Sequence, residues 1–153
     1  MIDILFSLNN PSLQLTGFEL GHIDMVFENG KVSSRNRSPD QSMMIFITIV
    51  DLLDGLKELM LNKKNKEFTL IGADSSFMIQ FNRLKNHQIG VYADNKTTCE
   101  INEADLAFSI YNACISFCEK YQNQLSNENC VEEDIKSALG DFKERILNLE
   151  AIK

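Results

Sequence analysis

The chain is poor in the residues that build catalytic and metal sites. It contains no tryptophan and only two histidines, His22 and His87, in 153 residues. No two of its cysteines form a C-x-x-C pair, and a structural zinc site needs about four ligands. Cys114 and Cys118 stand four residues apart on an expected helix. We expect the four cysteines to be buried or half-buried thiols in a reducing compartment: Cys99, Cys114, Cys118 and Cys130. We expect no metal and no cofactor.

Nucleotide-binding motifs and membrane-spanning runs are also missing. No G-x-G-x-x-G or G-K-[ST] sequence occurs, which argues against Rossmann and P-loop folds. The longest apolar run, residues 43–50, is followed by Asp51, whereas a membrane helix needs about 20 apolar residues. Asp3 lies where a secretory signal peptide carries positive charge, and no small-residue cleavage site follows. We therefore expect a cytoplasmic protein without membrane contact.

Hydrophobic residues make up 44% of the sequence, which predicts a single folded domain spanning residues 1–153. The net charge of −7 is unevenly distributed. Residues 1–102 contain 12 acidic and 10 basic residues, whereas residues 103–153 contain 10 acidic and 5 basic ones. Direct nucleic-acid binding needs lysine and arginine to neutralise phosphates, so this acidity argues against it. An acidic surface suits a basic partner.

The first part of the chain predicts an antiparallel meander. Apolar and polar residues alternate, as they do along strands that have one buried face. Asn29-Gly30 between two such runs is a strong hairpin signal, because a type I′ turn needs positive φ at both positions. We predict strands at residues 2–8, 13–16 and 22–27, and a further strand after Gly30.

A helix follows this meander. Residues 43–47 are rich in β-forming residues, and we predict a short strand there, with a helix as the alternative. From Thr48 the apolar residues recur with helical spacing, which predicts a helix over residues 48–62. Thr48 and Asp51 resemble a capping box. Gly55 costs about 1 kcal/mol inside a helix, so we expect it to allow close contact with the sheet.

The second half of the chain predicts a second meander and two helices. We expect Asn102 to cap a helix whose first turn contains Glu103 and Asp105. Strands are predicted at 67–72, 77–82 and 88–92, and helices at 103–125 and from about 132 to 149. The order predicts an α+β fold: an antiparallel sheet from two meanders, with a central helix and two C-terminal helices packed on it.

Two stretches are candidates for chemistry. Gly72-Ala73-Asp74-Ser75-Ser76 follows a strand but lacks the second glycine of a nucleophile elbow and leads into another strand. We interpret it as a hairpin turn, since Asp and Ser bond the local backbone. His22 and Asp24 share one face of a strand and could hold a metal with a distant third ligand, but we interpret them as ordinary neighbours.

Acidic residues cluster on two predicted helices. Asp51, Asp54 and Glu58 fall on one stripe of the first helix, which is a solvated face by default. A larger cluster begins the last helix and continues to Glu144, where helix-start chemistry and solvated surface are the ordinary explanations. As a hypothesis, partner-binding residues come from the turn and this cluster: Asp74, Ser75, Ser76, Glu128, Glu132, Glu133, Asp134 and Asp141.

The run "ITIVDLLDGLKELM" followed by "KEFTLIGADSSFMIQF", then a short strand and a long helix, resembles small bacterial immunity proteins of toxin–immunity systems. These include the immunity partners of contact-dependent growth inhibition toxins. The resemblance covers about residues 43–125 and rests on this layout and the Asp-Ser-Ser-Phe turn. It implies a non-enzymatic inhibitor that binds one cognate toxin domain, often a nuclease, and blocks its active site or substrate surface.

Two other classes of function remain open from the residues. One is a small hydrolase or metal-dependent enzyme that uses Asp74 and Ser75, or His22 and Asp24. The other is an adaptor or oligomerisation module, in which the helical last third pairs with a second copy to give a homodimer. The absence of catalytic motifs favours the inhibitor, because inhibition needs only a complementary surface.

Overall fold

The computed structural model describes residues 2–11, 14–28, 30–94, 96–121, 123–125 and 130–148. These residues form antiparallel sheets and helices, so the predicted α+β class is confirmed. No helix among them is both long and apolar enough to cross a membrane.

The first sheet contains the N-terminal meander. Its strands are β1 (Ile2–Leu8), β2 (Leu20–Phe27), β3 (Gly30–Ser33) and β4 (Met43–Met44). They follow the order β1-β2-β3, and β4 pairs with the beginning of β2. A hairpin joins these strands, as the Asn29-Gly30 signal predicts, but Phe27 pairs with Gly30, so Gly30 lies in β3 and not at the centre of the turn. Ile23 and Met25 face the core, so His22 and Asp24 lie on the opposite face of β2.

The second sheet contains β5 (Glu67–Ile71), β6 (Met78–Arg83), β7 (Gln88–Ala93) and β8 (Lys96–Asn102), in that order. The sequence prediction missed β8, because Lys96–Asn102 has too few apolar residues for a clear alternating pattern. The two sheets meet where β8 approaches β3. A Cβ atom added at Gly30 would lie 3.0 Å from the Thr98 side chain.

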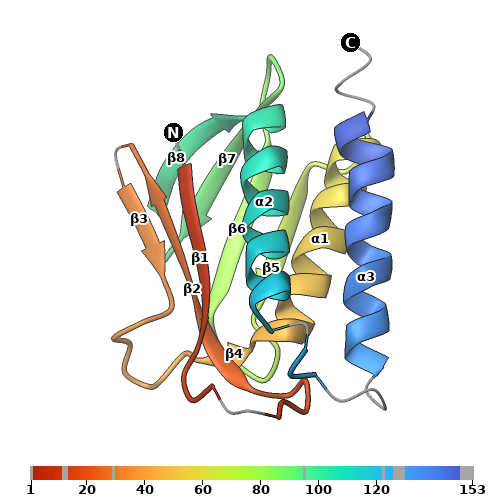
Figure 1. Cartoon of the computed structure of the whole chain (residues 1–153). Helices are drawn as coiled ribbons and strands as arrows, with labels where there is room; N and C mark the ends of the chain where they lie inside the picture. The colour runs from red at the N-terminus through yellow and green to blue at the C-terminus, as the bar shows by residue number, and fades with distance from the viewer. Residues whose placement is uncertain are drawn as a thin grey trace.

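The described residues form three α-helices, α1 (Ile45–Leu61), α2 (Glu103–Tyr121) and α3 (Cys130–Phe142), and a π-helical segment, η1 (Lys143–Leu147), continues α3. Figure 1 shows α1 between the sheets and α3, with α2 beside β1. The expected packing of a C-terminal helix on a sheet therefore holds for α2, whereas α3 packs on α1. Asn102 caps α2 as predicted, because its Oδ1 accepts hydrogen bonds from the Ala104 and Asp105 amides at 2.9 and 3.3 Å.

The core is centred on α1, in which nine of 17 residues are buried. Four aromatic rings join this helix to β1 and α2. The Phe46 ring lies 5.2 Å from that of Phe117, which in turn lies 6.1 Å from Phe6 and 5.0 Å from Tyr121. Each buried aromatic side chain contributes about 1.5–3 kcal/mol by leaving water. This cluster therefore fixes α2 against both α1 and the first sheet.

Three predicted boundaries were wrong. Residues 14–16 form no strand, because the buried Leu15 instead pairs with Leu125 and its amide bonds the Gln124 carbonyl at 2.7 Å. Leu13 lies outside the described residues. Helix α2 ends at Tyr121, not near residue 125.

Helix α1 begins at Ile45, three residues before its predicted start, and only two residues of the expected strand at 43–47 pair as strand. The Thr48 capping box is also wrong. The Thr48 hydroxyl lies inside the helix and donates to the Met44 carbonyl at 2.9 Å. It also accepts a hydrogen bond from the Ala73 amide at 3.0 Å. Tertiary contact with the β5–β6 turn thus outweighs the strand preference of these residues.

Gly55 allows the close approach that its position in a helix predicts. A Cβ atom at Gly55 would lie 2.1 Å from the Phe68 ring of β5. That ring stacks on Phe81 with centroids 5.9 Å apart, so its room to move is limited. Gly140 in α3 offers the contrast, because a Cβ atom there meets nothing within 4 Å.

We predict that Gly55→Ala destabilises the chain by up to about 2 kcal/mol. Alanine improves helix propensity by about 1 kcal/mol, but overpacking against Phe68 costs roughly 1–3 kcal/mol. Gly140→Ala, the matched control, should stabilise by up to about 1 kcal/mol. Urea unfolding of both variants measures the difference, and equal stabilisation by both would show that α1 and β5 do not meet tightly.

Candidate functional site

The Asp74-Ser75-Ser76 stretch is the corner of the β5–β6 hairpin. Asp74 adopts a left-handed conformation with φ of 55°, which Asp tolerates better than most residues. The Ser75 hydroxyl donates to the Gln41 carbonyl at 3.0 Å and accepts from the Phe77 amide at 3.1 Å. The Ser75 oxygen therefore holds the turn together, as the hairpin interpretation predicts. The arrangement joins the turn to the loop before β4.

Ser76 lies differently from Ser75, because its exposed side chain borders a hollow of about 260 Å³. This hollow lies on the outer face of the second sheet, where Met78, Gln80 and Tyr92 also line it. Ile71 and Met78, paired across β5 and β6, expose 55% and 54% of their surfaces on this face. The turn thus borders an open sheet face with polar and apolar side chains.

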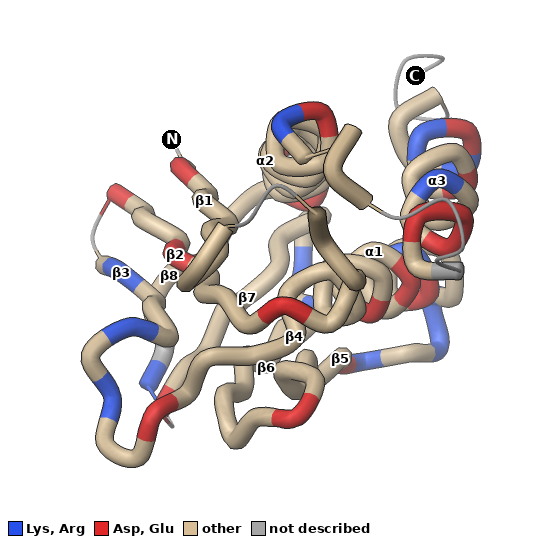
Figure 2. The backbone as a smooth tube through the Cα atoms, turned by 60° about the horizontal axis from the view of Figure 1, so that its bottom comes forward, with Lys and Arg blue, Asp and Glu red and all other residues tan. Residues whose placement is uncertain are grey.

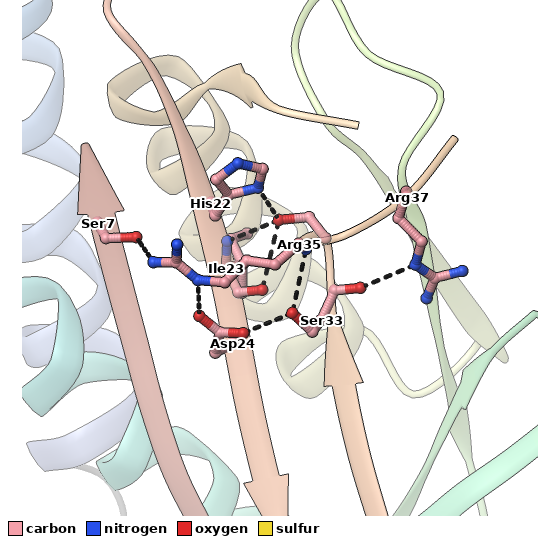
Figure 3. Close-up of polar contacts among 8 residues, drawn as sticks. Ser7, His22, Ile23, Asp24, Ser33, Arg35 and Arg37 are labelled. Carbon is pink, nitrogen blue, oxygen red and sulfur yellow. Dashed lines mark hydrogen bonds and ion pairs between the residues drawn. The ribbon is translucent and has the colours of Figure 1, made fainter. Parts of the chain in front are cut away.

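His22 and Asp24 belong to a polar cluster on the outer face of the first sheet (Figure 3). Arg35 reaches back from the loop after β3, and its Nε lies 2.7 Å from an Asp24 carboxylate oxygen. The same guanidinium bonds the Ser7 hydroxyl of β1. The Ser33 hydroxyl donates to the other Asp24 oxygen at 2.5 Å. The Asp24 carboxylate is therefore neutralised and ties the loop to β1 and β2.

These interactions set the protonation of Asp24. Burial of the carboxylate by itself raises the pKa, but hydrogen bonds from Ser33 and Arg35 and the Arg35 charge outweigh burial. The result is a pKa of Asp24 below its ordinary value. The carboxylate is thus a charged structural anchor over the whole neutral range.

His22 forms a pair with a serine that the sequence interpretation did not single out. Its Nδ1 lies 2.8 Å from the Ser34 hydroxyl, which also accepts from the Ile23 amide at 3.0 Å. Ser34 is fully buried, so no substrate has access to its oxygen. The hairpin signal in the sequence places residues 33–35 near His22 and Asp24, but a turn centred on Asn29-Gly30 would pair Asp24 with Arg35, whereas the structure pairs it with Ser33. The serine partners could therefore not be identified from the sequence.

The described residues do not assemble a site for metal binding or thiol chemistry. No group of three or more His, Cys, Asp or Glu side chains among them is placed to hold a metal ion. Burial raises the pKa of the Cys118 and Cys99 thiols to about 11, and it raises the pKa of the Cys114 thiol well above its ordinary value. These three thiols are free and partly or fully buried, as the composition predicts. The Cys130 side chain lies outside the described residues.

The acidic residues of α1 and α3 share one region of the surface. Together the two helices contain seven carboxylates and two lysines. In Figure 2 acidic segments lie along both helices, while the loop after β3 carries basic segments on the far side of the molecule. We call this region the acidic face and define it by Asp51, Asp54 and Glu58 of α1 and Asp134 and Asp141 of α3.

Helix geometry places the α1 carboxylates on this face. Asp51, Asp54 and Glu58 are all exposed and form one stripe, as their spacing predicts. Gly55 on one side of the stripe faces β5, and Lys57 on the other side faces α3. The stripe is therefore the part of α1 that neither neighbour covers.

Lys57 links the two helices across the acidic face. Its ammonium lies 3.2 Å from Asp141 and 3.9 Å from Asp54, and only 13% of its side chain is exposed. Asp134 stands two turns before Asp141 on the same side of α3. Because α1 and α3 run side by side in the same direction (Figure 1), Asp134 lies toward the half of α1 that contains Asp51. Lys57 thus contacts two of the five carboxylates that define this face.

The carboxylates of this face also interact unfavourably. Partial burial and the neighbouring Asp54 carboxylate raise the pKa of Asp51 above its ordinary value. Asp51 remains charged at neutral pH, so the folded chain keeps a charge that its surroundings disfavour.

The structure brings only some of the predicted partner-binding residues together. Asp134 and Asp141 join the acidic face, and Glu132 pairs with Lys136 at 3.2 Å on another side of α3. Glu133 is exposed at the start of α3. Glu128 lies outside the described residues. The β5–β6 turn, which contains Asp74, Ser75 and Ser76, contacts the beginning of α1, where the Ala73 amide bonds Thr48 one turn before Asp51.

Comparison with known proteins adds no relatives. No family model, curated protein or solved structure matches the chain.

Asp24→Asn tests the polar cluster through its pH dependence. The lowered pKa means that the charged carboxylate stabilises the folded chain above the unfolded-state pKa of about 3.9. This contribution is lost as pH falls through the lower folded-state pKa. We predict that the variant loses about 1–3 kcal/mol at pH 7, and that the difference from wild type disappears in strong acid.

Asp94→Asn serves as the control for this measurement. Asp94 pairs with Arg37 at 2.8 Å, but 61% of its side chain is exposed. Its loss should cost less than about 1 kcal/mol. Urea unfolding across the acid range compares the two variants, and a loss at Asp24 that does not change with pH would contradict the charged-anchor role.

Asp51→Asn should change the stability in the opposite direction to Asp24→Asn. The raised pKa means that the charge opposes folding at neutral pH, so its removal stabilises the chain by up to about 0.5 kcal/mol. The gain should vanish as pH falls through the raised pKa, because wild type then takes up the proton. Asp105→Asn, in the first turn of α2, should instead destabilise by about 0.3–1 kcal/mol through the helix dipole. Thermal unfolding of both variants checks the signs, and a loss of stability in Asp51→Asn would refute the unfavourable charge.

Proposed function

We propose that this chain is a non-enzymatic immunity protein, which binds a cognate bacterial toxin domain in the cytoplasm and neutralises it. The observation that carries this proposal is the acidic face. It presents five carboxylates from two helices, and two of them contact the mostly buried Lys57. A basic protein surface is the partner chemistry that complements it.

Two properties of the acidic face favour binding over a purely structural role. Most of its carboxylates lack a matching cation, because Lys57 contacts only Asp54 and Asp141 among the described acidic residues. Asp51 is held at a raised pKa, so its charge opposes folding. A charge kept at the expense of stability is expected where a partner later neutralises it.

The proposed partner is a basic toxin domain, and a nuclease fits this description well. Nucleases hold phosphate groups with lysine and arginine, so their substrate surface is positively charged. An acidic protein that covers this surface blocks substrate access without chemistry of its own. Opposite charges also speed the encounter and discriminate against wrong partners.

The test begins with the reading frame beside the one that encodes this chain. We expect its product to end in a basic toxin domain that forms a complex with this chain on co-expression and no longer harms the cell. Absence of both a complex and protection would refute the proposal.

Charge reversal locates the binding surface. We predict that Asp54→Lys, Glu58→Lys and Asp134→Lys together weaken toxin binding at least tenfold, measured by calorimetry, because they reverse the stripe without touching the core. Glu28→Lys, Glu67→Lys and Glu100→Lys together are the matched control, since these exposed carboxylates lie elsewhere and their reversal changes the net charge equally. Equal weakening by both triple variants would show that overall charge, and not the acidic face, drives binding.

A further inference from the structure

Strand β1 is the free edge of the first sheet. It pairs with β2 on one side, and no strand in the described part of the chain pairs with its other side. The register shows which backbone groups remain open. The Asn9 amide bonds the Leu20 carbonyl at 3.0 Å, so the odd-numbered residues of β1 bond β2. The even-numbered residues, among them Ile4 and Phe6, direct their N–H and C=O groups to the free side.

These open groups border a groove. A space of about 410 Å³ separates β1 from α2. The α2 wall carries small side chains at Ser109, Ala113 and Ser116, one turn apart from each other. The Phe117 ring closes the base of the groove against Phe6, with centroids 6.1 Å apart. The small residues leave the edge accessible although a helix stands beside it (Figure 1).

We propose that this groove binds an extended peptide segment of a partner protein, which adds to the first sheet as a strand beside β1. An extended backbone carries alternating donors and acceptors that match the open groups of Ile4 and Phe6. The segment's inward side chains would lie against the small residues of α2. This surface and its argument are independent of the acidic face.

The geometry favours a peptide over a second copy of this chain. In a symmetric pairing through β1, each copy brings its own α2 to the same side of the shared sheet. Because α2 stands directly beside the free edge, the two helices would occupy overlapping space, since packed helices need 8–10 Å between axes and strands lie about 4.8 Å apart. A bare segment brings no helix.

Charge defines the chemistry of the segment. Lys120 lines the groove on α2, and its ammonium lies 5.4 Å from the centre of the Tyr121 ring. Within the described residues neither Lys120 nor Asp3, near the beginning of β1, forms an ion pair. The segment that fits best therefore places an acidic side chain beside Lys120 and small or apolar side chains along α2.

Hydrogen exchange gives a direct readout of this proposal. The probe is a ten-residue random peptide library displayed on phage and selected on the whole chain, from which the most enriched peptide is synthesised. In the free chain the Ile4 and Phe6 amides should exchange quickly, whereas the Leu5 and Ser7 amides, bonded to β2, exchange slowly. Addition of the peptide should slow exchange at Ile4 and Phe6 at least tenfold.

Matched variants test the groove itself. Ser116→Phe fills the space beside β1 and should weaken peptide binding at least tenfold, whereas Ser137→Phe, at an exposed position of α3, should leave it unchanged. Lys120 is exposed, so Lys120→Glu does not alter the core. This variant should weaken binding of peptides that carry an acidic residue.

Three results would overturn the proposal. The first is a library that yields no enriched peptide. The second is a bound peptide that leaves exchange at Ile4 and Phe6 unchanged. The third is protection of these amides without peptide that increases with protein concentration, which would identify a second copy as the occupant. These variants leave the acidic face unchanged. A negative result for peptide binding therefore does not bear on the proposed toxin binding.

Discussion

Burial of α1 is the constraint on which the rest of the molecule depends. The sheets, α2 and α3 all pack around this helix, and nine of its 17 residues are buried. A helix so enclosed leaves a single stripe to solvent, and in this chain carboxylates occupy it. The buried apolar residues fix the orientation of α1 about its axis. They thereby determine that Asp51, Asp54 and Glu58 face the solvent.

The polar residues that resemble catalytic or metal-binding groups stabilise the fold of this molecule. Ser75 bonds backbone groups on both sides of the hairpin corner. Asp24 is held by Arg35 and Ser33, and the buried Ser34 holds His22. In each case a loop carrying few apolar residues is fixed to a sheet through hydrogen bonds. The acidic face differs, because in the described part of the chain only two of its five carboxylates, Asp54 and Asp141, form an ion pair.

Local patterns in the sequence predicted much of the fold. Alternation and the Asn29-Gly30 turn predicted β1 to β3, and helical spacing predicted the α1 stripe and the cap at Asn102. Gly55 signalled a close contact, and Phe68 supplies it. These features depend on residues near each other along the chain.

Features that depend on distant residues were not predictable in this way. The early start of α1 results from its contact with the β5–β6 turn, in which Ala73 bonds Thr48 from 25 residues away. Strand β8 forms because β7 offers a partner, not because its own pattern is strong. The acidic face needed the contact between Lys57 and Asp141, 84 residues apart. Sequence spacing showed the stripe but not the second helix beside it.

The central claim is that the acidic face steers a basic partner onto this chain. The most direct measurement is the association rate constant with the toxin domain as a function of salt concentration, for wild type and for the Asp54, Glu58 and Asp134 triple reversal. The account predicts that the wild-type rate falls steeply with salt, and that the triple variant associates slowly with little salt dependence. A wild-type rate that does not change with salt would contradict it.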